Sequence, residues 1–184
     1  MVFVKEDLRR KLLKLRIKEC RENKGEWDSL IVENIKDTPE FQSAHTVLAY
    51  HPLDTEPDIK PLFDTCFSYG KKLVLPKVCG DRLKLYAVED LSTLQKGPLG
   101  VFEPAEGEEV EPASLSISLV PAVAFDVEGY RLGFGKGFYD RLLERVSGKK
   151  IGVAYSFQVL NEIPRDPWDV PVDFIVTEGG IIRR

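Results

Sequence analysis

The chain lacks several features that would place it in other classes of protein. Its apolar runs have the length of strands, so the sequence predicts no membrane-spanning helix. Its first residues carry neither the long apolar core nor the small-residue cleavage site of a signal peptide. Its three cysteines are odd in number and show neither CxxC nor Cys/His metal spacing. We therefore expect a cytoplasmic protein with reduced thiols and no membrane partner.

The chain also has no excess of basic charge. Lysine and arginine number 26 against 30 for aspartate and glutamate, which gives a formal net charge of −4 at pH 7. Binding to a nucleic-acid backbone normally requires a basic face, so this charge argues against nucleic acid as a partner. No Ser/His/Asp or Cys/His arrangement suggests nucleophilic catalysis. We expect small molecules as partners and a monomeric protein.

The composition that is present is that of a soluble globular protein. Of 184 residues, 43% are hydrophobic and 30% are charged. A chain of this length can bury roughly 70% of the surface that its unfolded form exposes. There is no internal repeat, low-complexity segment or linker, so residues 1–184 are expected to form one domain.

The most informative segment is glycine-rich and spans residues 131–141. Its glycines stand at every second position, at Gly133, Gly135 and Gly137, and a helix-like run follows at once. A buried strand is expected just upstream, from Ser118 to Phe125. A glycine loop that leads into a helix presents unpaired backbone N–H groups, and the helix dipole adds partial positive charge there. These features predict an anion-binding loop.

Charged side chains accompany this loop. Arg131, Lys136 and Arg141 bring positive charge to the same place, and the carboxylate of Asp140 suits a hard cation such as Mg²⁺. The combination predicts a site for a polyphosphate, most economically a nucleotide with its metal. The spacing is neither that of a P-loop nor GxGxxG, and an ordinary tight turn is the alternative reading of the glycines alone.

Helices and strands are expected to alternate along the chain. The predicted helices are Val4 to Glu22, Glu26 to Ile35, Pro57 to Tyr69 and Phe138 to Val146, and the other predicted strands are Thr46 to Tyr50, Lys72 to Pro76, Leu83 to Val88, Lys150 to Tyr155 and Val172 to Thr177. Such alternation favours an α/β fold, a single-domain mainly parallel sheet with helices on both faces in a Rossmann-like three-layer arrangement. Ligands of such folds bind beyond the carboxyl ends of strands, where the loop after Phe125 is expected.

Other positions are ambiguous from the residues alone. Lys5 and Arg9 share one face of the first helix, for which a solvated basic face is the ordinary reading. Glu56 follows the first strand and overhangs the same crevice, with His51 beside it. Tyr155 ends a later strand and is expected to face the crevice, where its ring could stack on a ligand.

The sequence also resembles a known family. The segment from Val120 to Asp126, then Gly129 and residues 131–141, closely resembles the signature of 5-formyltetrahydrofolate cyclo-ligases, also called methenyltetrahydrofolate synthetases. The resemblance covers nearly the whole chain and includes a basic N-terminal helix, an acidic loop and an element from Gly100 to Pro104. Lys136 stands where many members have glycine, and we interpret it as an extra phosphate contact.

The resemblance implies roles for residues throughout the chain. It implies that ATP is bound by Lys5, Arg9, Arg131, Leu132, Gly133, Phe134, Gly135, Lys136, Gly137, Phe138 and Tyr139. The folate substrate would contact His51, Glu56, Phe134, Gly135, Lys136, Gly137, Phe138 and Tyr155. Asp173, which alone reads as a turn residue, would hold Mg²⁺ together with Asp140, and Lys136 and Arg131 would act in catalysis. Either Asp54 or Glu56 could be the folate carboxylate, and we prefer Glu56.

The activity implied by the resemblance is the ATP-dependent cyclisation of 5-formyltetrahydrofolate to 5,10-methenyltetrahydrofolate. ADP and phosphate would be released through a phosphorylated formyl (iminium phosphate) intermediate, with ATP and Mg²⁺ required. Two other classes remain open from the residues. One is another phosphate-handling α/β enzyme, such as a sugar-phosphate isomerase, and the other is a non-catalytic nucleotide-binding module.

Overall fold

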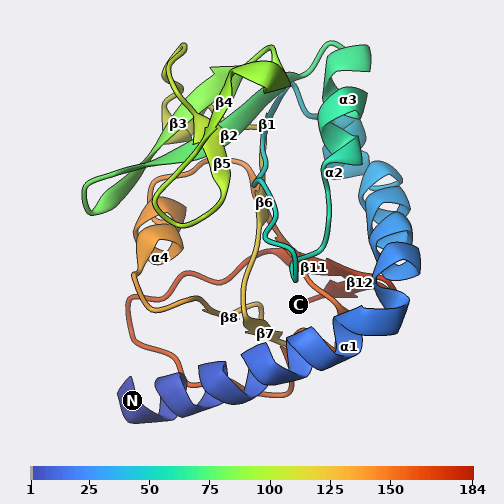
Figure 1. The fold of residues 1–184 in the computed structure, drawn as a ribbon, viewed down its shortest axis with the longest axis vertical. Coiled ribbons are helices and arrows are strands. Elements are labelled where there is room, and N and C mark those ends of the chain that lie inside the picture. The colour runs from blue at the N-terminus through green and yellow to red at the C-terminus, as the bar shows by residue number, and fades with distance from the viewer. Residues whose placement is uncertain (1) are drawn as a thin grey trace.

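A seven-stranded sheet forms the centre of the molecule (Figure 1). The structure is a computed structural model that describes residues 2–184. The strands of this sheet are β1 (Thr46–Leu48), β2 (Lys72–Cys79), β3 (Arg82–Val88), β6 (Ile117–Val120), β9 (Lys149–Val153), β11 (Phe174–Thr177) and β12 (Gly180–Arg183). Their order is β12-β11-β9-β6-β1-β2-β3, with all inner strands parallel and only the two edge strands antiparallel to their neighbours. The predicted mainly parallel sheet is confirmed.

Helices and two small sheets surround the central sheet. The helices are α1 (Val2–Lys36), α2 (Pro39–Ser43), α3 (Pro61–Ser68) and α4 (Phe138–Leu143), and short 3-10 turns lie at Leu91–Thr93, Pro112–Ser114 and Ser156–Gln158. One small sheet pairs β4 (Leu94–Lys96) with β5 (Phe102–Pro104), and the other joins β10 (Val159–Leu160), β7 (Ala124–Asp126) and β8 (Arg131–Leu132).

Apolar side chains alternate between the two faces of the central sheet. Leu73 and Leu75 of β2 pack in the core under α1 and α3, whereas Val74 between them packs in the core that includes α4. Because successive strand residues point to opposite faces, this alternation shows that both faces are covered. Helices therefore lie on both faces, as predicted, and Phe125 of β7 adds the small sheet to the α4 face.

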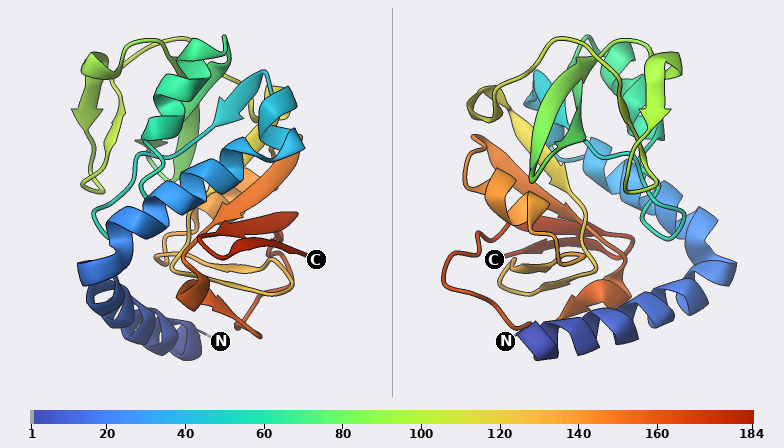
Figure 2. Two further views of the ribbon diagram at one scale, coloured as in Figure 1. Left: turned by 90° about the vertical axis from the view of Figure 1, so that its right-hand side faces the viewer. Right: turned by 60° about the vertical axis from the view of Figure 1, so that its left-hand side comes forward.

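The N-terminal helix is longer than predicted and carries two separate apolar contacts. The two helices expected on either side of Gly25 form the single helix α1, which Figure 2 shows running along one side of the molecule. Leu12 near its start packs on the small sheet of β7 and β8, while Ile31 and Ile35 near its end pack on the central sheet. Gly25 lies inside this helix without interrupting it, and a Cβ placed on it would meet no atom within 4 Å. Ile17 of this helix is 54% exposed.

The apolar run from Ser118 to Phe125 is two strands rather than one. β6 ends at Val120, and β7 begins at Ala124 in the other sheet. Pro121 follows β6 directly, and proline has no backbone N–H with which to continue a strand ladder. The glycine loop consequently follows β8, and not the buried central strand.

Other predicted boundaries shift by a few residues. The helix predicted from Pro57 begins at the second proline, Pro61, and the helix after the glycine loop ends at Leu143. β2 is longer than predicted because it forms an antiparallel hairpin with β3. In residues 2–184, no helix combines the length and the apolar character needed to span a membrane.

Candidate active site

The sheet topology defines one crevice before any side chain is considered. From β1 the chain proceeds to β2 on one side, whereas β6, β9 and β11 extend the sheet on the other side of β1. Parallel sheets bind ligands beyond the carboxyl ends of strands where the order reverses in this way. The loop after β1 carries Glu56, and the segment after β6 leads to the glycine loop. Topology therefore brings these two predicted segments to the same edge of the sheet.

The glycine loop adopts a backbone that requires glycine. Gly135 has φ +106° and Gly137 has φ +72°, in the left-handed region that other residues avoid. Among the described residues, none accepts a hydrogen bond from the backbone amides of residues 133–137. The helix that follows, α4, has only 6 residues, so its dipole is small. The predicted binding of an anion by this loop would therefore depend on its free amides and on nearby cations.

Arg131 is turned inward beneath this loop. Its Nε and Nη2 donate to the carbonyl oxygen of Pro121 at 3.2 and 3.1 Å, and its Nη1 lies 3.3 Å from Asp140 Oδ1. Burial lowers the pKa of Arg131, and the Asp140 carboxylate opposes that shift. A guanidinium that is 8% exposed and bonded on three nitrogens supports the loop from below. In this structure the Arg131 guanidinium is occupied by Pro121 and Asp140, whereas we predicted that it binds a phosphate.

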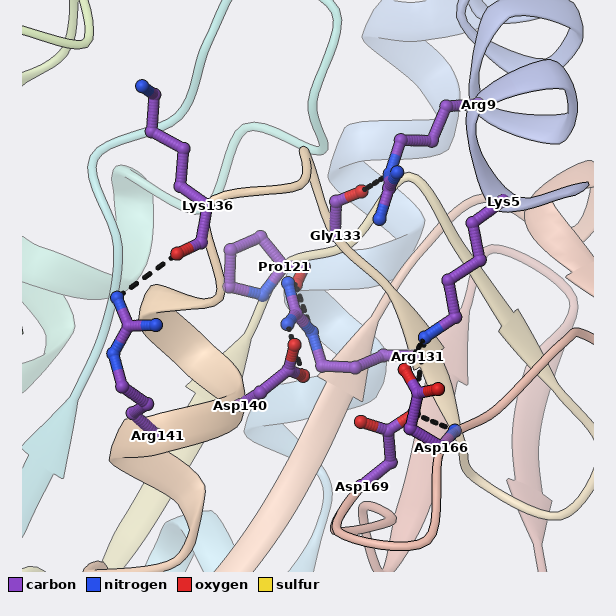
Figure 3. Close-up of polar contacts among 10 residues, drawn as sticks. All are labelled: Lys5, Arg9, Pro121, Arg131, Gly133, Lys136, Asp140, Arg141, Asp166 and Asp169. Atoms are coloured by element: carbon purple, nitrogen blue, oxygen red, sulfur yellow. Dashed lines mark hydrogen bonds and ion pairs between the residues drawn. The ribbon is translucent and has the colours of Figure 1, made fainter. Parts of the chain in front are cut away.

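Two other cations lie on the outer side of the loop (Figure 3). Arg9 of α1 donates from Nε to the carbonyl oxygen of Gly133 at 2.6 Å, which joins the N-terminal helix to the glycine loop. Lys136 is exposed and its side chain extends away from the loop. Its carbonyl oxygen accepts a hydrogen bond from Arg141 Nη2 at 3.0 Å, so Arg141 holds the backbone of the loop. Arg9 and Lys136 thus both belong to the surroundings of this loop.

Lys5 is engaged elsewhere. Its Nζ lies 2.5 Å from Asp166 Oδ2 and 3.5 Å from Asp169 Oδ2, in the segment that precedes β11. Its side chain is 14% exposed. In this arrangement Lys5 ties the helix to the C-terminal segment, and its predicted contact with ATP stays a prediction.

Glu56 is a buried carboxylate at the crevice. It is 4% exposed, and its Oε1 accepts a hydrogen bond from the Leu53 amide at 2.7 Å. Burial raises the pKa of Glu56, while the Leu53 amide and the nearby charge of Arg16 act in the opposite direction. Asp54 is exposed, so the burial expected of a recognition carboxylate favours Glu56. The hydroxyl of Tyr50 donates to the Pro57 carbonyl at 2.8 Å and holds this loop.

His51 lines a separate depression of about 680 Å³ between α3 and the β4–β5 hairpin. Its ring lies 5.1 Å from that of Phe102 and 6.4 Å from that of Phe63, centroid to centroid. Its Nδ1 is buried without a hydrogen-bond partner in the part of the chain that the structure describes. Burial lowers the pKa of His51, and Lys60 lowers it further. The predicted substrate contact of His51 stays a prediction.

Tyr155 does not face the crevice, contrary to our prediction. Its side chain is fully buried, and its hydroxyl donates to Asp28 Oδ1 of α1 at 2.6 Å. Its ring stacks on Phe157 at 5.7 Å and lies 5.5 Å from that of Trp27. Burial and the Asp28 carboxylate raise the pKa of Tyr155. A side chain enclosed on all sides anchors α1 to the sheet and offers no surface for a ligand.

Asp173 lies at the end of the sheet where β9 and β11 begin. Its amide donates to the Lys150 carbonyl at 2.7 Å, and its Oδ2 accepts from the Lys150 amide at 2.7 Å. Lys150 pairs with Ser118 in β6, three positions before Pro121, which is roughly 10 Å along a strand. Asp140 contacts Arg131, whose side chain bonds to Pro121 at the other end of β6, and the prediction that both carboxylates share one Mg²⁺ stays a prediction. No group of three or more potential metal ligands occurs within residues 2–184.

The aromatic residues of the loop differ in exposure. Phe134 is 50% exposed, whereas Phe138 and Tyr139 are half-buried. The Arg131 guanidinium carbon lies 5.1 Å from the Tyr139 ring centroid, and that of Arg141 lies 5.6 Å from the Phe138 ring centroid. Phe134 is therefore the most exposed of these three rings.

The sequence reading missed several residues of this region. Arg16 of α1 is 2% exposed and lies under Phe134, with its guanidinium carbon 5.5 Å from the ring centroid. Its place on the helix, seven positions after Arg9, was a usable signal because both then lie on one face. Asp166 and Asp169 had no signal in their local sequence. Glu103 of the Gly100 to Pro104 element is buried and accepts from the Val78 amide at 3.1 Å, which makes that element a structural anchor.

Fold and site together define a class of protein. The chain is a three-layer α/β protein whose candidate ligand site, at the switch point of a parallel sheet, combines a glycine loop, cations and a buried carboxylate. The model of the 5-formyltetrahydrofolate cyclo-ligase family matches residues 2–178. The chain belongs to this family of enzymes, as the resemblance implied.

Individual relatives agree with this assignment. The chain is 34% identical over 151 residues to the 5-formyltetrahydrofolate cyclo-ligase of Escherichia coli (strain K12), covering 78% of this chain and 83% of that protein. The NMR structure of Aquifex aeolicus 5,10-methenyltetrahydrofolate synthetase superposes with a TM-score of 0.89 at 48% identity, over 98% of this chain and 92% of that one. The structure of the 5,10-methenyltetrahydrofolate synthetase from Mycoplasma pneumoniae superposes with a TM-score of 0.76 at 29% identity, over 95% of this chain and 98% of that one.

Proposed function

We propose that this protein catalyses the ATP-dependent cyclisation of 5-formyltetrahydrofolate to 5,10-methenyltetrahydrofolate. The observation that carries the proposal is the juxtaposition at one sheet edge of the glycine loop, whose amides are free, and the buried carboxylate of Glu56. The glycine loop suits the phosphates of ATP, and the carboxylate of Glu56 suits the edge of a pterin that carries hydrogen-bond donors. Membership of the cyclo-ligase family supports the same pairing of substrates.

The phosphates of ATP bind at the glycine loop in this proposal. Backbone amides of residues 133–137 donate to phosphate oxygens, and Gly135 and Gly137 allow the backbone to approach them closely. Lys136 and Arg9 neutralise the negative charge from the outer side of the loop. Arg131 acts indirectly, by fixing the loop to the end of β6 through Pro121.

The folate binds on the other side of the crevice. The carboxylate of Glu56 accepts hydrogen bonds from the ring N–H and the amino group of the pterin, with charge assistance. Phe134, half-exposed on the glycine loop, supplies an aromatic surface between the two ligands. We infer that the formyl oxygen then lies on the same side of the crevice as the phosphates.

The reaction needs activation of a poor leaving group. The formyl oxygen attacks the γ-phosphorus and ADP departs, which gives an iminium phosphate. The N10 amine then attacks the formyl carbon, its proton is lost, and the C–O bond breaks to release phosphate and close the ring. Such a transfer depends on positioning and on neutralisation of charge, which the loop amides, Lys136 and Arg9 provide.

Asp140 fits the requirement for a magnesium ligand beside ATP. Its side chain is 33% exposed, and only Oδ1 contacts Arg131, at 3.3 Å. Magnesium in nucleotide sites is commonly held by one or two carboxylates, by phosphate oxygens and by water, so a single carboxylate at the loop suffices. When bound, the ion supplies further neutralisation of the phosphates.

The proposed activity is tested by mixing 5-formyltetrahydrofolate, ATP and Mg²⁺ with the protein and following the absorbance of the methenyl product. We expect the band to grow, with one ADP formed for each product molecule, and to stay flat when ATP is omitted. A flat trace with folded protein and all components would contradict the proposal. ATP hydrolysis without methenyl formation would instead indicate another phosphate-handling enzyme, and ATP binding without turnover would indicate a nucleotide-binding module.

A further inference from the structure

Arg16 is a buried cation whose hydrogen-bonding capacity is unused. It is 2% exposed, yet its Nε and Nη1 have no hydrogen-bond partner among the described residues. A guanidinium carries five N–H donors, and leaving buried donors unpaired destabilises a folded protein. Structures rarely retain such a group unless a molecule from outside completes its hydrogen bonds.

The surroundings of Arg16 include the carboxylate of Glu56. Glu56 is buried beside it and interacts with it electrostatically, but no Arg16 nitrogen lies within 4.0 Å of the carboxylate in the part of the chain that the structure describes. Glu56 Oε1 is occupied by the Leu53 amide. Two opposite charges therefore stand close together in a buried place without forming an ion pair.

The glycine loop covers Arg16. The ring of Phe134 lies over the Arg16 guanidinium at 5.5 Å, and this ring is 50% exposed. Arg9, which precedes Arg16 by nearly two helical turns, contacts the same loop through Gly133. The unpartnered guanidinium is thus adjacent both to the proposed folate carboxylate and to the proposed phosphate loop.

We propose that Arg16 recognises the 4-oxo group of the pterin, while Glu56 accepts from the neighbouring ring N–H and amino group. These three pterin groups lie consecutively on one edge of the ring, as two donors followed by one acceptor. A carboxylate beside a guanidinium, close but not bonded to each other, is complementary to that edge. Arg16 is then a specificity-determining residue, and the substrate class is 4-oxo rather than 4-amino pterins. This inference rests on the proposed function.

The test compares binding of two ligands to three proteins. Calorimetry measures the affinity of 5-formyltetrahydrofolate and of its 4-amino counterpart for the wild type, for Arg16→Met and for Arg10→Met. Arg10 is the matched control because it lies on the same helix with its side chain 68% exposed. We expect Arg16→Met to weaken the 4-oxo ligand by about tenfold to a hundredfold, and to change the 4-amino ligand by less than about twofold. Arg10→Met should change neither.

Thermal unfolding separates recognition from a structural role. Replacing an unpaired buried guanidinium by a methionine of similar length removes unsatisfied donors, so we expect the melting temperature of Arg16→Met to be unchanged or higher. Arg16→Lys, which keeps one donor group, should retain part of the preference for the 4-oxo ligand. A lower melting temperature with an unchanged ligand preference would show that Arg16 is structural and would overturn the inference.

The two proposals fail in distinguishable ways. If the wild type forms the methenyl product and Arg16→Met keeps the wild-type preference between the ligands, the role of Arg16 alone is wrong. If Arg16→Met weakens both ligands equally, Arg16 acts through general charge and the 4-oxo assignment is wrong. If the wild type neither binds 5-formyltetrahydrofolate nor forms product, the proposed function and the inference are both wrong.

Discussion

Lys136 is the residue that tests the proposed phosphate site most directly. Its side chain is exposed, extends from the glycine loop and forms no hydrogen bond with other residues in 2–184. We expect Lys136→Ala to raise the KM for ATP about tenfold, or roughly 1.4 kcal/mol, and to leave the KM for folate nearly unchanged. Lys149→Ala is the control, since Lys149 is exposed at the opposite end of the sheet. Equal ATP kinetics in both variants would contradict the proposed contact.

Glu56 predicts a pH dependence of stability with a definite sign. Burial raises its pKa, so the protonated form is more favourable in the folded state than in the unfolded chain. The contribution of protonated Glu56 to the stability of the fold is complete below the pKa that this side chain has in the unfolded chain. It is lost as the pH rises through the raised pKa of the folded state. Glu56→Gln keeps an acceptor for the Leu53 amide and cannot ionise, so we expect it to melt about 2–4 °C higher than the wild type at pH 8, with this difference shrinking towards pH 4.

Melting curves of the wild type and Glu56→Gln between pH 4 and pH 8 measure this effect. A difference that does not change with pH would show that Glu56 is not the titrating group. The same variant should bind 5-formyltetrahydrofolate more weakly, because a neutral amide replaces the charged acceptor. Higher stability combined with weaker binding is the signature of a buried recognition carboxylate.

At the scale of elements, the glycine loop and helix α1 place glycine in two different conformations. Gly137 has φ +72°, and a side chain there would come within 2.7 Å of Arg141 Nη1. We expect Gly137→Ala to lose about 1–2 kcal/mol of stability and to bind ATP more weakly, since the strain falls on the loop itself. Gly25 is helical with open space around it, so Gly25→Ala should gain about 0.5–1 kcal/mol and leave ATP binding unchanged.

Chemical unfolding and ATP titration of both variants check this contrast. Gly137→Ala with wild-type ATP affinity would mean that the loop backbone is not a phosphate cradle. Destabilisation by Gly25→Ala would mean that the helix is interrupted at residue 25 after all, as the sequence alone had suggested.

Elements were predictable where a local signal decided them. The apolar run of β2, the alternation of apolar residues in β3, and proline and glycine at the limits of α3 place these elements within a few residues. The split of the 118–125 run followed from Pro121, a visible signal that the apolar character obscured. The continuity of α1 across Gly25 was not predictable locally, because its two ends are held by packing on two different sheets.

At the scale of the whole molecule, the direction of each strand decides which residues meet. Asp173 stands just before β11, and in a parallel sheet the start of a strand lies at the edge opposite the ligand crevice. That strand direction was readable from the sequence and argues against the pairing of Asp173 with Asp140. Tyr155 was misplaced for another reason, because only packing against Trp27 and Asp28 of α1 shows that its ring is enclosed. Arg16 and the acids around Lys5 likewise depend on contacts across the whole fold.

The central claim is that the formyl oxygen becomes phosphorylated, and isotope transfer tests it most directly. The wild-type protein is given 5-formyltetrahydrofolate whose formyl group carries heavy oxygen, together with unlabelled ATP and Mg²⁺, and the released phosphate is analysed by mass spectrometry. In the proposed reaction the formyl oxygen attacks the γ-phosphorus and leaves with it, so we predict that each phosphate formed contains one heavy oxygen. Methenyl product accompanied by unlabelled phosphate would contradict the account.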